Sequence, residues 1–134
     1  MADVIVIGIQ ADMWDPAFSG PVNDQPLSYD HFTSFVQRLA ADTLAWGKPV
    51  LLFNGDSHMF VDDHPLSSGA PVYQRTMYSV PNPVPNLRRI TVNGSTTPCH
   101  EWLKLTIDPK LADVFYYQRI KFQNQPGFPA SCLP

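Results

Sequence analysis

The stretch that decides the fold is Pro49-Val-Leu-Leu-Phe-Asn-Gly-Asp-Ser-His58. Val50 to Phe53 form a short apolar run that Asn54 and Gly55 end abruptly, so we expect a strand buried on both faces. Asn54, Asp56 and His58 follow, and such side chains can bind a metal ion or move a proton. Chemistry just past the end of a buried strand recurs in α/β proteins. The alternative is an ordinary turn in which Asp56 caps the backbone and His58 is half exposed.

A second strand and a helix are predicted before this stretch. Residues 4–9 (Val-Ile-Val-Ile-Gly-Ile) are continuously apolar and β-branched, which is typical of another buried strand. From Ser28, a good N-cap, apolar side chains recur at helical spacing, and Gly47 suits the position after a helix. We therefore expect a helix over residues 29–46. Strand, helix and strand in close succession predict parallel neighbouring strands with the helix packed on their sheet.

The remainder of the chain predicts a different arrangement. Prolines cluster between residues 59 and 86, so we expect an irregular segment without a central strand. Alternating apolar and polar residues then predict strands at 87–92, 102–107 and 114–122, joined as an antiparallel meander. The predicted fold class is therefore α+β, with one βαβ unit followed by an antiparallel meander. A Pro-rich tail follows at residues 123–134.

Composition excludes several classes of protein. The 134 residues suffice for one domain, only 16% of them are charged, and the net charge is −3. No basic run is present, so we expect no nucleic-acid partner. No stretch of about twenty apolar residues is present either, so we expect no membrane span. Cys99 and Cys132 lack the spacing of a zinc knuckle.

The segment Gly55-Asp-Ser-His58 resembles the last motif of the calcineurin-like metallophosphoesterases, which is usually Gly-His-x-His after a buried strand. The resemblance extends from about Val4 to Phe122, and it implies a single partial metallophosphoesterase domain over residues 1–122, part of a two-layer β-sandwich. The order of the surrounding segments is similar to the C-terminal half of a subgroup of bacterial calcineurin-like proteins: Lys48–Phe53, Val61–Leu66, Asn86–Gly94 and Trp102–Pro109.

This resemblance implies a phosphoesterase site. Members of the family hold a pair of divalent metal ions (Mn²⁺, Mg²⁺ or Fe/Zn) that polarise a phosphoryl oxygen and generate a hydroxide nucleophile. His58 matches the second histidine of the motif and is the expected metal ligand and catalytic residue. Asp56 replaces the first histidine, and a carboxylate favours a harder cation such as Mn²⁺ or Mg²⁺, or leaves that position empty. Asp12 is the third candidate ligand, with Gln10 as the alternative. The substrate class implied is a small-molecule phosphate mono- or diester.

The sequence also departs from the family pattern. Gly-Asp-x-x-Asp and Gly-Asn-His-Asp/Glu motifs are absent. Residues 62–64 spell Asp-x-His, but they follow the last motif, so we interpret this match as a coincidence. Arg88 and Arg89 are adjacent in a predicted strand, so one of the pair is expected to face inward or toward an edge. A solvated edge is expected, with a phosphate clamp as the alternative.

We therefore expect the C-terminal part of a phosphoesterase that is inactive as this fragment alone. The alternative is a non-catalytic remnant or interaction domain that retains the sheet without the metals. In either case, an uncovered sheet surface would favour self-association.

Overall fold

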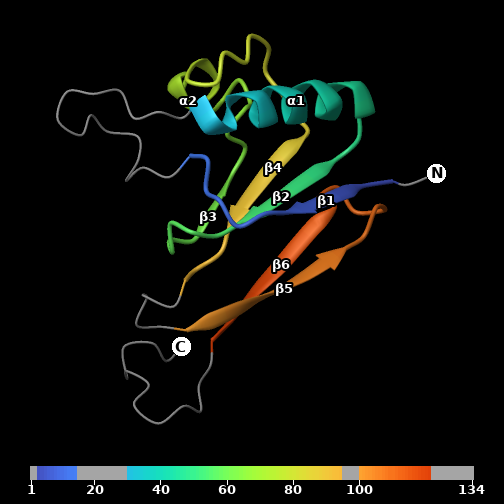
Figure 1. Ribbon diagram of the computed structural model, residues 1–134. Helices are drawn as coiled ribbons and strands as arrows, with labels where there is room; N and C mark the ends of the chain where they lie inside the picture. Colours follow the sequence, from blue (N-terminus) through green and yellow to red (C-terminus); the bar gives the residue numbers. More distant parts are fainter. Residues whose placement is uncertain (1–2, 15–29, 95–99, 122–134) are drawn as a thin grey trace, which may run out of the picture.

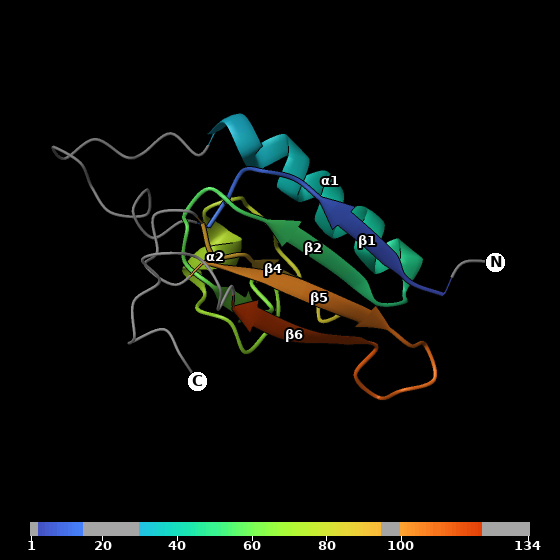
Figure 2. The ribbon, with the colours of Figure 1, turned by 90° about the horizontal axis from the view of Figure 1, so that it is seen from below.

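The computed structural model describes residues 3–14, 30–94 and 100–121, which form three layers (Figures 1 and 2). A four-stranded sheet lies in the middle, with helix α1 on one face and a two-stranded hairpin on the other. The expected N-cap, Ser28, and the Pro-rich tail lie outside the described residues. Within the described part of the chain, no helix has the length and apolar character needed to cross a membrane. The elements are β1 (Ile5–Gly8), α1 (Asp30–Trp46), β2 (Val50–Asn54), β3 (Val61–Asp63), α2 (Tyr73–Thr76), β4 (Leu87–Thr91), β5 (Glu101–Ile107) and β6 (Phe115–Lys121).

The predicted βαβ unit is confirmed. Strands β1 and β2 are parallel neighbours, with Ile5 opposite Val50 and Gly8 opposite Phe53. Helix α1 connects them and buries Val36, Leu39 and Ala40 against the sheet. Gly47 ends the helix at φ +69°, a left-handed conformation that glycine adopts without a steric penalty.

The predicted antiparallel meander is wrong for its first strand. Strand β4 pairs in parallel with β2, so that the order in the sheet is β1-β2-β4-β3. Only β5 and β6 form an antiparallel hairpin. The alternation at residues 87–92 had indicated a half-exposed strand, whereas Leu87, Arg89, Ile90 and Thr91 are all buried. Burial of Arg89 is possible because two carboxylates neutralise it, which is a long-range match that local alternation does not reveal.

Strand β1 is not the fully buried strand that its sequence indicated. It forms the edge of the four-stranded sheet, and the side chains of Ile5 and Val6 are 36% and 41% exposed. A continuous β-branched run is typical of a strand with neighbours on both sides. In the described residues only β2 pairs with it. Among the described residues this outer edge therefore has no strand partner, and it carries partly exposed apolar side chains.

The proline-rich segment between β2 and β4 is a packed part of the core. Leu66, Tyr78 and Val84 are fully buried beside Met13 and Trp14. The indole N–H of Trp14 donates to the carbonyl of Gln74 at 3.0 Å. A short edge strand, β3, precedes the prolines and pairs antiparallel to β4. The expectation of an irregular segment without a central strand is confirmed. Its packing into the core was not predicted, because the segment has no periodic pattern of apolar residues.

The hairpin packs on the opposite face of the sheet from α1. Leu51, Ile90 and Phe115 form a second buried cluster between the two layers. The guanidinium of Arg88 makes a two-pronged pair with Asp62 of β3, with both N···O distances at 2.8 Å. It also donates to the Phe115 carbonyl of β6. Arg88 therefore fastens the hairpin to the sheet through polar bonds as well as apolar contact.

Replacing Asp62 is predicted to loosen the hairpin. Burial raises the pKa of Asp62, but hydrogen bonds from Arg88 and Tyr117 outweigh this effect and lower the pKa below its ordinary value of 3.8. Because the folded-state pKa is lower than the unfolded one, the stabilisation is present above about pH 4 and is lost as pH falls through the folded-state pKa. Asp62→Asn should cost about 2 kcal/mol at pH 7, measured by urea unfolding.

The matched control is Asp42→Asn, because Asp42 pairs with Arg38 on the exposed surface of α1. This control should leave the unfolding midpoint nearly unchanged. Equal effects of the two substitutions at pH 7, or a loss for Asp62→Asn that does not shrink as pH falls below 3.8, would contradict the anchoring role of Asp62.

Candidate metal-binding site

The predicted site residues lie where parallel strands end. Strands β1, β2 and β4 point the same way, so their C-terminal ends meet at one edge of the sheet. Asp12 follows β1, the segment Gly55–His58 follows β2, and Gly94 follows β4. Ligands bind in many open α/β sheets at this kind of edge.

The loop after β2 is held in an unusual backbone conformation. Asp56 and His58 have φ values of +73° and +61°, in the left-handed region that few non-glycine residues adopt. Gly55 anchors the start of the loop, since its N–H donates to the Gln10 carbonyl at 2.9 Å. Between the two left-handed residues, the hydroxyl of Ser57 donates to Asp12 Oδ2 at 2.7 Å. Such conformations persist only where surrounding contacts hold them, and they cluster at functional sites.

His58 is placed by the strand-end backbone of β4. A Cβ atom built on Gly94 would come within 2.3 Å of the His58 Cγ, so the imidazole packs directly on this glycine. The Gly94 N–H also donates to the His58 carbonyl at 3.3 Å. Position 94 therefore requires glycine because of the imidazole, whatever the local turn needs.

Asp12 lies beside this loop but is committed to other partners. Its side chain is 1% exposed and forms an ion pair with Arg89, whose side chain is 3% exposed, at 2.9 Å. Its two oxygens accept hydrogen bonds from the Trp14 N–H, Arg89 and the hydroxyls of Ser57 and Thr91. To bind a metal ion, Asp12 would have to exchange some of these bonds for the cation. Its evident role is to join the ends of β1, β2 and β4.

The two motif residues remain as the candidate donors of the loop. Asp56 is exposed and His58 is half buried. In the described part of the chain, no group of three or more His, Cys, Asp or Glu side chains is placed to hold a metal ion. A carboxylate and an imidazole suit one divalent cation of the Mn²⁺ or Zn²⁺ type. They fall short of the ligands that a two-metal centre needs.

Two residues of this edge, Ser57 and Thr91, escaped the sequence analysis, and the environment of a third, Arg89, differs from the expectation. Ser57 occupies the variable position of the motif, yet it anchors the loop to Asp12. Arg89 is a buried ion-pair partner, so neither the expected solvated edge nor the phosphate clamp describes it. The hydroxyl of Thr91 lies 2.9 Å from the side-chain oxygen of buried Asn54. Only its position at the end of a buried strand could have pointed to Thr91. That position becomes evident only when β4 is placed beside β2.

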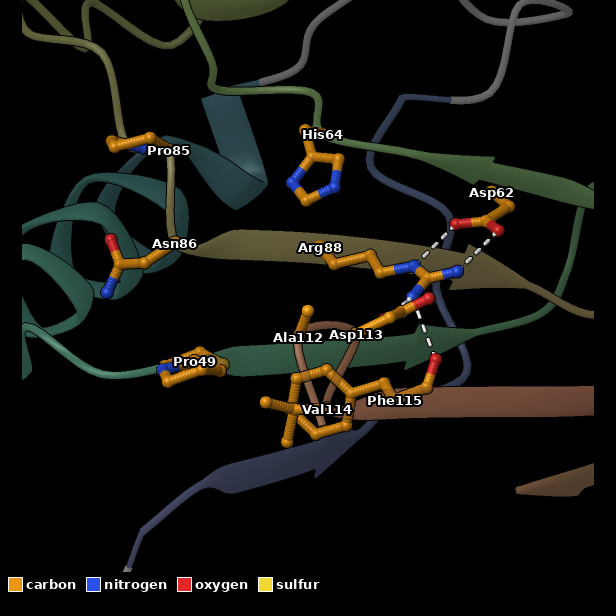
Figure 3. Close-up of a pocket in the computed structure, with 11 residues that line it drawn as sticks. Pro49, Asp62, His64, Pro85, Asn86, Arg88, Ala112, Asp113, Val114 and Phe115 are labelled. Carbon is orange, nitrogen blue, oxygen red and sulfur yellow. Dashed lines mark hydrogen bonds and ion pairs between the residues drawn. The ribbon is translucent and has the colours of Figure 1, made fainter. Parts of the chain in front are cut away.

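A cavity of about 490 Å³ opens at the other end of the sheet, where β2 and β4 begin (Figure 3). Arg88 lies in its wall, already bonded to Asp62, Asp113 and the Phe115 carbonyl. His64 faces the same cavity and its Nδ1 lies 2.9 Å from the Leu87 carbonyl. Asp62 is an Arg88 partner here, which agrees with reading the Asp-x-His match as a coincidence. The bonds of Arg88 in the cavity wall join the hairpin to the sheet.

Comparisons with known proteins add no identification. No family model matches the chain, and no curated protein or solved structure is significantly similar to it. Any functional conclusion therefore depends on the residues and their geometry.

The ion pair of Asp12 generates a stability prediction. Asp12→Ala leaves Arg89 with one buried carboxylate partner fewer, and breaking a buried pair in this way costs about 3–5 kcal/mol. Asp56→Ala removes an exposed carboxylate from the same edge and should cost only about 1 kcal/mol, because alanine tolerates the left-handed backbone less well than aspartate. Urea unfolding of the two variants measures the difference. Equal costs, or a larger cost for Asp56→Ala, would contradict the bracing role of Asp12.

Proposed function

We propose that this chain is the C-terminal part of a metal-dependent phosphoesterase, and that its loop Gly55–His58 supplies ligands to a divalent metal centre. The substrate class is a small-molecule phosphate mono- or diester. The observation that carries the proposal is the backbone of this loop. Asp56 and His58 both hold left-handed conformations at the C-terminal end of a buried strand, on either side of an anchored serine.

The surrounding residues support this proposal through rigidity. A metal site requires donors whose positions vary little, so the supporting bonds matter as much as the ligands. Here Gly55 is fixed to the segment after β1, Ser57 to Asp12, and the His58 imidazole to Gly94. Asp12 is in turn paired with Arg89, so its charge is neutralised within the brace. The exposed carboxylate of Asp56 is left as the local anionic donor.

When bound, the divalent ion would polarise a phosphoryl oxygen and lower the pKa of a water molecule. The protein would hold the ion with the carboxylate of Asp56 and the neutral imidazole of His58. The other ligands would come from outside the described residues. The free edge of β1, where strands could be added, is consistent with such completion.

The alternative is a non-catalytic interaction domain that keeps the sheet and has lost the metals. The engagement of Asp12 by Arg89 favours it, because one of three predicted ligands already has a structural role. The two functions differ in whether a divalent ion binds at the loop. They do not differ in fold, and for the isolated chain we expect no enzymatic turnover in either case.

The test is a calorimetric titration of the purified chain with Mn²⁺. We expect weak, saturable binding of one ion, and Asp56→Ala and His58→Ala should each raise the Kd by about tenfold or more, since each removes one of two donors. The matched controls are Asp108→Ala and His100→Ala, which remove a carboxylate and an imidazole elsewhere on the surface. Unchanged binding in both loop variants would favour the interaction domain.

The activity of the isolated chain provides a second test. An aryl phosphate and an aryl phosphodiester, incubated with excess Mn²⁺, should not be hydrolysed at an enzymatic rate, because two donors cannot form a two-metal centre. Turnover that depends on Mn²⁺ and disappears in His58→Ala would show that the chain, or an oligomer of it, builds a complete site.

A further inference from the structure

A second cavity, of about 380 Å³, lies on the hairpin side of the sheet next to the candidate loop. This volume is within the range of about 300–1,000 Å³ that is usual for sites of small organic molecules. Three aromatic residues, Phe53, Phe60 and Trp102, line it together with the apolar residues Val92 and Leu103. We call the cavity lined by these five residues the aryl pocket.

Residues on either side of the candidate loop Gly55–His58 line the aryl pocket. Phe53 precedes this loop in the chain and Phe60 follows His58 by two residues. Val92, another residue of the pocket wall, lies next to the start of the loop, since its N–H donates to the Asn54 carbonyl at 2.9 Å. Two residues later, Gly94 supports the His58 imidazole. A molecule in the pocket would therefore lie beside the loop that carries Asp56 and His58.

The charges around the pocket favour an uncharged occupant. Glu101 contributes to the wall, but its side chain is only 5% exposed and is paired with Arg119 at 2.7 Å. The Arg119 guanidinium itself stacks on Phe60, 4.1 Å from the ring centroid. Both charges are thus engaged with each other. Asn93 is the remaining polar residue of the wall and can form a hydrogen bond that orients a ligand.

We propose that the aryl pocket binds the aromatic leaving group of the phosphate ester, with the phosphate directed to the loop of Asp56 and His58. Flat rings stack well on aromatic side chains, and three aromatic residues line this cavity, of which Trp102 is 47% exposed. The phosphate half of this inference rests on the proposed function. The aromatic half rests on the cavity alone.

The test separates the two halves with different probes. 1-Naphthol carries the aromatic group without phosphate, and its binding to the full chain is followed by saturation-transfer NMR. We expect saturable binding, and Trp102→Ala should raise the Kd about tenfold through loss of stacking. Tyr116→Ala is the matched control, because Tyr116 is an exposed aromatic of the same hairpin outside the cavity, and it should change the Kd less than twofold.

A filling variant covers the case in which Trp102→Ala does not fold. Asn93→Trp places an indole in the cavity and should abolish 1-naphthol binding, with circular dichroism confirming the fold. Absence of saturable binding to the original chain, or equal effects of Trp102→Ala and Tyr116→Ala, would overturn the proposal.

The link to the metal site is tested with 1-naphthyl phosphate in the presence of Mn²⁺. This probe should bind at least tenfold more tightly than 1-naphthol, and His58→Ala should remove that gain. If 1-naphthol binds through Trp102 but the phosphate adds nothing, the aromatic site stands and the proposed function fails. If Mn²⁺ binds at His58 and 1-naphthol does not bind, the aryl pocket fails and the proposed function stands.

Discussion

Two adjacent arginines on β4 hold the three layers of this structure together. Because neighbouring side chains of a strand point to opposite faces, Arg88 reaches the hairpin and Arg89 reaches the side of Trp14. Each is matched by one of two adjacent aspartates on the antiparallel neighbour β3, Asp62 for Arg88 and Asp63 for Arg89. Apolar burial supplies most of the stabilisation on both faces. These four charges add specific bonds, through which Arg88 contacts the hairpin on one face and Arg89 contacts Asp12 on the other.

Arg89, on the face of the sheet that carries Trp14, also supports the geometry of the candidate site. Arg89 holds Asp12, Asp12 accepts from Ser57, and Ser57 lies between the two left-handed residues of the loop. A disturbance of the ion pair would thus reach His58 through a chain of short bonds. The sequence resemblance assigned Asp12 to the metal, whereas the structure gives it a place one step behind the loop. The ligand assignment of Asp12 stays a prediction, and its bracing role is what the geometry shows.

Local patterns in the sequence predicted some elements well and failed for specific physical reasons. Helix α1 and the parallel pairing of β1 with β2 follow from apolar spacing, from Gly47 and from a short connection, all of which are local signals. The placement of β4 depended on where the charge of Arg89 is neutralised. That neutralisation comes from Asp12 and Asp63, which are distant in sequence, and alternation carries no information about them. Asp56 and His58 were identified as candidates by their position after a strand, but Ser57 and Gly94 gain their roles only through contacts across the strand ends.

The central claim is that a divalent cation binds at the loop between β2 and β3. Its most direct test is paramagnetic broadening of amide NMR signals by substoichiometric Mn²⁺. Broadening falls steeply with distance from the ion, so the experiment locates the cation without relying on activity or on a substitution. The amide signals of Asp56, His58 and Gly94 should be lost first, while those of Asn86 and Asp113 at the opposite end of the sheet persist. Broadening that begins at Asp113, or that affects both ends equally, would contradict the claim.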